Sequence, residues 1–514
     1  MHFVEKTIGS ISILFLDSRQ FKQRDKVGAF VIHGEIHQNV RQYINGRWET
    51  SATTGVSANP SDTSEVVAEY ARADRRQAEA AIRAATEAFP HWSHSTPQRR
   101  ADVLDRIGAE LIARKDELGL LLAREEGKTL PEAVAETARA GQVFKFFAGE
   151  ALRGGGAENV ASVRAGVQVD VTREPVGVVG LITPWNAPFV IPAWKIAPAL
   201  AHGNSVVFKP AELVPACGGA LAEIISRAGL PAGAFNLVMG SGREVGQALV
   251  DSALVDALSF TGSAANGERV LQAAATRRAK VQLETGGKNA LVVLADADLD
   301  RAVDCAVQGA YFSAGQRCTA SSRLIVEAPV HDAFVAKLRQ RLKTLKIGHA
   351  LERGIDIGPV ANEERLAMNL AWVDIAREEG AEHVWGGEAL ERSTPGHYMS
   401  PALFLAKPSH RIAREEIFGP LACVLRADDY DQALALCNDT PFGLCAGICT
   451  NSLKHAMHFR RHAVVGMTMV NLPTAGVDFH VPFGGRKGSG YGPREQGRHA
   501  AEFYTTVKTG YMLA

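Results

Sequence analysis

The chain has few cysteines, and the apolar run near its N-terminus is short. Its 514 residues include seven cysteines, an odd number, with no CxxC pair or nearby histidine cluster at zinc-ligand spacing. We therefore expect no metal site, and reduced thiols in a reducing, cytoplasmic compartment. The apolar residues 11–16 are too few to span a membrane, and no small-residue cleavage site of a secretory signal follows them.

The chain also lacks an excess of charge of either sign. It has 56 Lys and Arg residues against 56 Asp and Glu residues, which gives a formal net charge of zero. No dense block of Lys or Arg provides the basic surface that nucleic acids or anionic membranes require. The sequence therefore excludes these partners and favours a small molecule.

The chain is long and rich in apolar residues. A chain of 514 residues with 46% hydrophobic content can fill two or three cores, so we expect a multi-domain globular protein. Residues 1–39 do not fit this pattern, and we interpret them as an N-terminal extension that can be disordered. The globular part begins near Val40, where residues 43–48 predict a strand, a turn and a second strand.

The apolar pattern predicts a helical layer followed by two α/β blocks. Residues 73–140 have helical periodicity. Four short apolar runs then alternate with helical segments, which predicts parallel strands with crossover helices. These runs are 176–182, 205–208, 235–239 and 255–260. Residues 280–294 and 321–326 begin the second α/β block.

Two strand-like stretches stand outside these blocks. They are residues 167–173 and 503–511. Ribbons of this kind often pair between subunits, and the alternative is that both are ordinary edge strands.

One cysteine lies in a context that suits a nucleophile. Cys318 follows a flexible Gly-Gln turn and has small neighbours, which would leave its sulfur accessible. A free thiol with a pKa of about 8.5 is only slightly ionised at neutral pH, so a catalytic cysteine needs a base or donors that stabilise the anion.

Two residues could supply this help. Glu284 ends an apolar strand just before Gly286 and Gly287, and a carboxylate held there can activate water. Asn186 lies in a loop with two prolines, and its amide can donate to a developing oxyanion. Taken singly, such a glutamate is also typical of a cap and such an asparagine of a turn.

Three segments are candidates for binding phosphate or ribose. Residues 240–246 have one residue too many for GxGxxG spacing, so we expect a loop there. Residues 260–267 are a better site, because a strand ends in Thr-Gly-Ser where a helix begins and leaves N–H groups free. Lys209 and Glu212 close another strand and could hold the hydroxyls of an adenosine ribose. A plain helix cap and a surface ion pair are the respective alternatives.

Together these motifs resemble the aldehyde dehydrogenase superfamily. Asn186, Lys209, Glu212, Glu284 and Cys318 stand in the order and approximate spacing of that family, and the resemblance runs from about Val40 to the end. Two further family motifs follow, Glu415–Pro420 and Pro482–Gly485.

The resemblance implies an α/β fold of three parts, with the active site between the first two. A Rossmann-type cofactor domain would comprise residues 40–152 and 174–285. An α/β catalytic domain would comprise residues 286–489. A β-ribbon oligomerisation element, residues 153–173 and 490–514, would build a homodimer or a homotetramer.

The resemblance also implies a reaction and its residues. Cys318 would attack an aldehyde, Asn186 would stabilise the oxyanion, hydride would pass to NAD or NADP, and Glu284 would activate the water that hydrolyses the thioester. Glu284 argues against a CoA-acylating relative, and Lys195 matches a family lysine near the cofactor. The implied cofactor contacts are Ile182, Thr183, Pro184, Trp185, Lys209, Glu212, Gly242, Phe260, Gly262, Ser263, Glu416 and Phe418.

The sequence departs from the family pattern at two positions. Thr285 stands where Leu or Met is usual, which is expected to alter packing only. Thr506 stands where many members carry a glutamate linked to proton relay, which puts that relay in doubt and leaves Glu284 as the main base.

The substrate is inferred from two loops. Residues 470–482 and 491–497 are similar to those of 2-oxoglutarate semialdehyde dehydrogenases, which implies oxidation of 2,5-dioxopentanoate to 2-oxoglutarate. Arg317, Phe189 and Phe479 are the candidate substrate contacts, and an outward-facing structural role is the alternative for Arg317. Succinate semialdehyde or an aromatic aldehyde remains an alternative substrate, and a catalytically silent structural protein is the alternative from another class.

The cofactor also stays open between NAD and NADP. Glu212 can bond a ribose 2′-hydroxyl but would repel a 2′-phosphate unless it swings away, which favours NAD. Lys209 would favour a phosphate.

Overall fold

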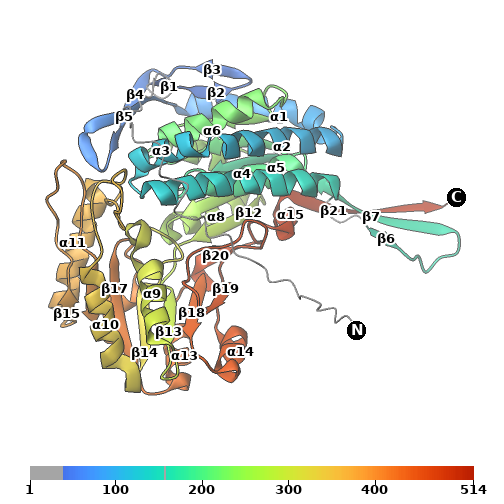
Figure 1. Cartoon of the computed structure of the whole chain (residues 1–514). Helices are drawn as coiled ribbons and strands as arrows, with labels where there is room; N and C mark the ends of the chain where they lie inside the picture. The colour runs from blue at the N-terminus through green and yellow to red at the C-terminus, as the bar shows by residue number, and fades with distance from the viewer. Residues whose placement is uncertain (1–38, 155–157, 514) are drawn as a thin grey trace, which may run out of the picture. The chain divides into compact units, whose positions relative to one another are not determined.

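The computed structural model describes residues 39–154 and 158–513 (Figure 1). The predicted extension, residues 1–39, lies outside the described residues except for its last position. Among the described residues, no helix is both long enough and apolar enough to cross a lipid bilayer.

An eight-stranded sheet forms the first α/β block of the described chain, in the order β20-β12-β11-β8-β9-β10-β2-β3. The five strands from β12 to β10 are parallel, which confirms the predicted alternation of strands and crossover helices. The strands are β2 (Gln42–Ile44), β3 (Arg47–Glu49), β8 (Val178–Ile182), β9 (Ser205–Lys209), β10 (Phe235–Leu237), β11 (Ala257–Gly262), β12 (Lys280–Thr285) and β20 (Gly490–Tyr491).

Helices pack against this sheet, and α2, α4 and α5 lie side by side (Figure 1). Local sequence explains where they begin: the Asp74 side chain accepts from the Gln77 N–H at the start of α1, and Thr129 and Glu132 form a capping box at the start of α4. The helices are α1 (Arg75–Ser93), α2 (Pro97–Ala113), α3 (Lys115–Glu126), α4 (Leu130–Leu152), α5 (Val190–Ala201), α6 (Pro215–Arg227), α7 (Gln247–Asp251) and α8 (Ala264–Thr276). A small sheet of β1 (Asn39–Val40), β5 (Asp62–Arg72) and β4 (Thr53–Asn59) lies at the start of the described chain.

A seven-stranded sheet forms the second block, in the order β15-β16-β17-β14-β13-β18-β19. Every residue of β13 and β18 is buried, as expected for parallel strands covered on both faces. The strands are β13 (Ala290–Val293), β14 (Arg323–Glu327), β15 (Glu382–Trp385), β16 (Ala402–Leu405), β17 (Leu421–Ala427), β18 (Cys445–Cys449) and β19 (Met467–Val470). The helices are α9 (Leu299–Ala310), α10 (His331–Lys343), α11 (Glu363–Glu378), α12 (Arg411–Arg414), α13 (Tyr430–Asn438) and α14 (Leu453–His462).

A three-stranded ribbon projects from the rest of the described chain (Figure 1). It consists of β6 (Glu158–Val160), β7 (Val167–Pro175) and β21 (Thr505–Leu513), and β7 pairs antiparallel with β21 along its whole length. The two predicted strand-like stretches therefore pair with each other within one chain. Phe503 and Tyr504 are not part of the strand, because they belong to the buried helix α15 (Ala501–Tyr504).

Two expectations about boundaries differ from the structure. β20 pairs with β12 in the eight-stranded sheet, so the segment after residue 490 joins that sheet before the ribbon begins at Thr505. The loop expected at 240–246 is instead a helical turn, Gly242–Gly246, which leads into α7. The sequence does carry the signal for it, because the Ser241 hydroxyl accepts from the Glu244 N–H in the Ser-x-x-Glu pattern of a helix start.

Candidate active site

Cys318 lies in a turn that the protein holds tightly. The short helix Phe312–Gly315 follows α9, and its Ser313, Ala314 and Gly315 all have positive φ angles, of 53°, 52° and 65°. Left-handed backbone at two non-glycine residues is strained and persists only where the surroundings enforce it. At Gly315 a Cβ would lie 2.1 Å from the carbonyl oxygen of Gly419, so this turn must be glycine to touch the segment after Phe418.

The Cys318 thiol is poorly ionised in the free chain. Burial raises its pKa to about 12, and the nearby Glu416 and Glu284 carboxylates act in the same direction. The backbone N–H groups of Cys318 and Thr319 act in the opposite direction, because they stabilise the thiolate. Cys318 as a whole residue is nevertheless partly exposed, whereas the six other cysteines are buried.

Asn289 fixes the backbone around the nucleophile. Its Nδ2 donates to the carbonyl oxygens of Cys318 at 2.7 Å and Ala320 at 3.0 Å, and its Oδ1 accepts from the Cys445 N–H at 3.1 Å. Sequence reasoning assigned no role to Asn289, which lies five residues after Glu284. A buried asparagine with both ends of its amide in use was not distinguishable there from a turn residue.

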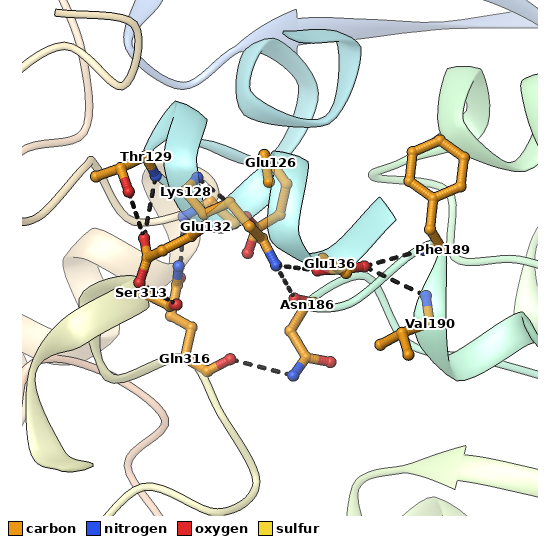
Figure 2. A network of polar contacts seen from close by, with 12 residues as sticks. Glu126, Lys128, Thr129, Glu132, Glu136, Asn186, Phe189, Val190, Ser313 and Gln316 are labelled. Atoms are coloured by element: carbon orange, nitrogen blue, oxygen red, sulfur yellow. Dashed lines mark hydrogen bonds and ion pairs between the residues drawn. The ribbon is translucent and has the colours of Figure 1, made fainter. Parts of the chain in front are cut away.

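Asn186 lies in the loop between β8 and α5, and its Nδ2 donates to the carbonyl oxygen of Gln316 at 3.1 Å (Figure 2). This bond links the amide to the turn that carries Cys318. One N–H of the amide remains for a second acceptor.

A buried network clamps the Asn186 loop from the helical layer (Figure 2). Lys128 Nζ donates to the carbonyl oxygen of Asn186 at 2.8 Å and pairs with Glu136 at 2.6 Å. Glu136 also accepts from the N–H groups of Phe189 at 3.0 Å and Val190 at 3.4 Å. Lys128, just before α4, therefore holds the carbonyl group of Asn186, and Glu136, on α4, holds the backbone that follows it.

The same helix holds the turn of the nucleophile. Glu132 accepts from the Ser313 hydroxyl at 2.8 Å and from the Thr129 hydroxyl at 2.8 Å (Figure 2). Sequence reasoning missed Lys128, Glu132 and Glu136, although a lysine among four glutamates at a helix start was the available signal.

Charge compensation makes this buried cluster possible. Burial by itself would lower the pKa of Lys128, but Glu126 and Glu136 reverse this effect and the pKa lies above its ordinary value. Burial raises the pKa of Glu126 to about 7, while Lys128 opposes the rise. The lysine therefore remains an ammonium that can donate to Asn186.

Glu284 is the last residue but one of β12 and is buried. Burial raises its pKa well above the usual carboxyl range, Glu495 adds to the rise, and Lys195 and Arg494 oppose it. Its Oε2 has no hydrogen-bond partner among the described residues. At Gly484 a Cβ would lie 2.5 Å from Glu284 Oε1, so the glycine leaves room for the carboxyl group.

Lys195 forms a fully buried ion pair with Glu495. Lys195 Nζ donates to Glu495 Oε1 and, at 2.6 Å, to the Ser259 hydroxyl. The absence of a glutamate at position 506 therefore does not leave Glu284 without a neighbouring carboxyl group. Thr506 itself is exposed on the ribbon, opposite Glu174. Glu284 does have a second buried carboxyl group nearby, and sequence reasoning missed it because residues 491–497 were used only as a subgroup motif.

The carboxyl ends of the parallel strands present unpartnered polar atoms. The hydroxyls of Thr183 and Thr261 are buried without a hydrogen bond among the described residues, and the Ser263 side chain makes no cap bond at the start of α8. Burial lowers the pKa of Lys209 to about 8, while Glu212 opposes the shift. Ligands of open α/β sheets bind at this edge, and free N–H groups at a helix start suit phosphate.

The remaining residues expected to bind the cofactor form two groups: three that make contacts described below, and five at or beyond the strand ends. Trp185 and Phe418 contact each other edge to face, with ring centroids 5.5 Å apart. Glu416 accepts from the Gly287 N–H at 2.9 Å and its pKa is raised by burial. Those at strand ends or in the loops beyond them are Ile182, Pro184, Phe260, Gly262 and Gly242, the last of which begins the helical turn before α7.

A cavity of about 280 Å³ lies beside Cys318 and Asn186, and both residues line it. Arg317 and Arg139 line it as well, as do the rings of Trp194 and Phe483. The structure does not bring two of the predicted substrate contacts to this cavity.

Those two residues are Phe189 and Phe479. Phe189 is fully buried in the core at the start of α5, and Phe479 packs against Phe146 with ring centroids 6.5 Å apart. The prediction followed the sequence positions of the loops, which do not reveal toward which side each ring points. The aromatic lining comes instead from Trp194, on α5, and Phe483.

Comparisons with known proteins agree with this site. The model of the aldehyde dehydrogenase family matches residues 48–510. The chain is 40% identical to the alpha-ketoglutaric semialdehyde dehydrogenase of Bacillus subtilis, over 91% of this chain and 97% of the relative. It is 41% identical to the alpha-ketoglutarate semialdehyde dehydrogenase of Haloferax volcanii, over 92% and 98%. It is 38% identical to the 2,5-dioxopentanoate dehydrogenase of Saccharolobus solfataricus, over 91% and 98%.

Solved structures give the same result. The betaine aldehyde dehydrogenase of Staphylococcus aureus, in complex with NAD⁺, is 34% identical with a TM-score of 0.90, over 93% of this chain and 95% of that one. The chain belongs to the aldehyde dehydrogenase family, and it is an oxidoreductase that acts on aldehydes. The predicted family and fold are thereby confirmed.

The raised pKa of Cys318 gives a direct test. A thiol is neutral below its pKa, so alkylation of the cofactor-free protein by iodoacetamide should be slow at neutral pH. The rate should rise about tenfold per pH unit up to about pH 10, because it follows the thiolate fraction. Intact-mass kinetics with Cys318→Ser as the control would measure this, and a rate that levels off below about pH 9 would contradict it.

Proposed function

We propose that this chain oxidises 2,5-dioxopentanoate to 2-oxoglutarate with NAD or NADP, through a thioester on Cys318. The observation that carries the chemistry is the cavity that Cys318 and Asn186 both line. The three relatives that are named for this semialdehyde support the choice of substrate.

Each step has a residue that suits it. Cys318 attacks as the thiolate, after its thiol has lost its proton: Sγ bonds to the aldehyde carbon, and the Asn186 amide together with the Cys318 backbone N–H stabilises the oxyanion. NAD or NADP, when bound, would supply the acceptor for the hydride that this carbon loses. The thioester that remains is hydrolysed by a water from which Glu284 removes a proton; the acid leaves the site, and Cys318 is regenerated in the chain.

Glu284 can act as this base because of its buried setting. A carboxyl group with a raised pKa is a stronger base than an ordinary one, and it becomes active only as the pH rises through that pKa. The buried Lys195–Glu495 pair contributes to this tuning, because Glu495 raises the pKa of Glu284 and Lys195 lowers it.

The residues at the strand ends fit a dinucleotide. Lys209 and Glu212 would hold the adenosine ribose, and Ser263 with the start of α8 would hold the pyrophosphate. Glu416 and Phe418 would hold the nicotinamide ribose and ring. The unpartnered hydroxyls of Thr183 and Thr261 support this assignment, since buried polar groups normally have partners.

The cavity also supports a substrate that carries a carboxylate. Arg317 donates through its Nη2 to the carbonyl oxygen of Gln308, while its Nε is buried without a hydrogen-bond partner among the described residues. Among the described residues Arg139 has no hydrogen bond of its own, and burial lowers its pKa while Glu136 and Asp478 oppose the shift. Arg139, on α4, is therefore the better candidate for the substrate carboxylate.

We further propose a homodimer or homotetramer in the cytoplasm. The ribbon leaves Val160, Val507, Tyr511, Met512 and Leu513 exposed, which suits contact with another subunit. All seven cysteines are free, which suits a reducing compartment. The division into cofactor domain, catalytic domain and oligomerisation element is proposed on the same basis, with the ribbon at residues 158–175 and 505–513.

The substrate is tested first with an aldehyde panel. Cofactor reduction should give the highest kcat/KM with 2,5-dioxopentanoate, compared with succinate semialdehyde and benzaldehyde, and Cys318→Ala should abolish it. A different best aldehyde with an inactive Cys318→Ala variant would leave the chemistry in place and reject the substrate. Activity that survives without Cys318 would reject the mechanism.

Glu284→Gln should separate the two halves of the reaction. Hydride transfer should persist as one burst of reduced cofactor per active site, after which turnover should fall by about 100- to 10,000-fold, because the thioester lacks its base. Stopped-flow absorbance and intact mass of the acyl-enzyme would measure both effects. In the wild type the deacylation rate should rise with pH at higher pH than for an ordinary carboxyl group. Unchanged steady-state turnover in the variant would contradict the role of Glu284.

Arg139→Gln should raise KM for 2,5-dioxopentanoate by about 10- to 100-fold, which is the effect of one charge-assisted bond. KM for benzaldehyde should change little, because this aldehyde has no carboxylate. Arg317→Gln is the matched control, since it removes the other guanidinium that lines the cavity. A larger rise in KM for Arg317→Gln than for Arg139→Gln would assign the carboxylate to Arg317 instead.

A further inference from the structure

Glu212 is not free at the adenosine end of the cofactor site. Arg72 Nη2 donates to Glu212 Oε1 at 2.6 Å and Arg72 Nε donates to the same oxygen at 3.0 Å. The Tyr70 hydroxyl approaches this oxygen at 3.4 Å. The arginine comes from the end of β5, in the small sheet, so a separate part of the chain reaches the carboxylate that follows β9.

The pair remains accessible to a ligand. The Arg72 side chain is 44% exposed and the Glu212 side chain is 29% exposed. A guanidinium has five N–H donors, and the bonds to Glu212 use two of them. Glu212 Oε2 makes no hydrogen bond among the described residues, so a ribose hydroxyl can still donate to it.

The charges around Glu212 change the preference between a 2′-hydroxyl and a 2′-phosphate that Glu212 alone would set. A lone carboxylate accepts from a 2′-hydroxyl and repels a 2′-phosphate. Arg72 neutralises that carboxylate, and the Lys209 ammonium, which lies within electrostatic reach of Glu212, adds positive charge. Planar guanidinium groups bind phosphate through paired N–H donors.

We infer that Arg72 recognises the 2′ position of the adenosine ribose. It neutralises Glu212 and donates to a 2′-phosphate, so that the site binds NADP as well as NAD. This inference rests on the proposed function, in that a dinucleotide binds at the strand ends. It assigns the tolerance of NADP to a residue outside the eight-stranded sheet.

The test measures binding of cofactor fragments to the cofactor-free protein by calorimetry. The fragments 2′,5′-ADP and 5′-AMP differ in the 2′-phosphate. The wild type should bind 2′,5′-ADP at least as tightly as 5′-AMP. Arg72→Ala should weaken 2′,5′-ADP by about 10-fold or more and 5′-AMP by less than about threefold, because only the first loses a charge-assisted bond. The ratio of kcat/KM for NADP to that for NAD should fall by a similar factor.

Two further variants and one control sharpen the result. Arg72→Lys should restore part of the loss, because it keeps the charge and loses the planar donor pair. Glu212→Gln should strengthen 2′,5′-ADP binding while Arg72 is present. Arg377→Ala, which removes the guanidinium of the exposed pair with Asp374, should change neither fragment. Circular dichroism would verify folding, which is expected because exposed ion pairs contribute little to stability.

Three outcomes would overturn the inference. Equal weakening of both fragments in Arg72→Ala would mean that Arg72 only orders Glu212. Binding of 5′-AMP but not 2′,5′-ADP to the wild type would reject the inference and leave the proposed function standing. Binding of neither fragment would reject both, because the dinucleotide site itself would be absent.

Discussion

The interaction on which the site depends is the burial of Lys128 among carboxylates. A buried ammonium without partners would lose its proton or destabilise the fold, so the acidic side chains of α3 and α4 must accompany it. Once paired with Glu136, the lysine has a donor left for the carbonyl oxygen of Asn186. Glu132, one helical turn before Glu136, reaches the turn of Cys318 through Ser313. The distance between the amide and the thiol is thus set by one helix start, and the two loops that carry chemistry need no rigidity of their own.

Desolvation governs the rest of the chemistry. The same burial raises the pKa values of Cys318, Glu284, Glu416 and Glu495, and in each case it is the largest cause. The effect is useful for Glu284, because a base must have a high pKa, and unfavourable for the thiol, because a nucleophile must be ionised. The backbone N–H groups of Cys318 and Thr319 offset part of this effect at the sulfur, and the Cys318 N–H is also a proposed donor to the oxyanion. The site therefore keeps its nucleophile protonated at rest and still stabilises the anion that the reaction produces.

The elements that sequence predicted well are those governed by local pattern. The parallel strands β8, β9, β10 and β11 fall on the four predicted apolar runs. Glu284 lies near the end of a strand, and Cys318 and Asn186 lie in turns. Contacts made across the chain were not predictable in this way. Arg72 and Glu212 are 140 positions apart, and Lys195 and Glu495 are 300 positions apart, so no local spacing connects them. The direction of a ring is equally hidden: Phe189 and Val190 are neighbours, yet only Val190 lines the cavity, because Phe189 turns into the core.

Glycines determine how closely the two acidic groups can approach the backbone. A Cβ at Gly286 would lie 1.8 Å from Glu416 Oε2, and one at Gly484 would lie 2.5 Å from Glu284 Oε1. Both distances are below the 3.0 Å under which a Cβ atom essentially never approaches a non-bonded heavy atom, so a side chain at either position would displace a carboxyl group. Gly315 plays the same part for the nucleophile's turn, against Gly419. Three groups of the reaction are therefore positioned by residues that have no side chain, and the Gly-Gly pairs of the sequence belong to the active site as much as the acids beside them.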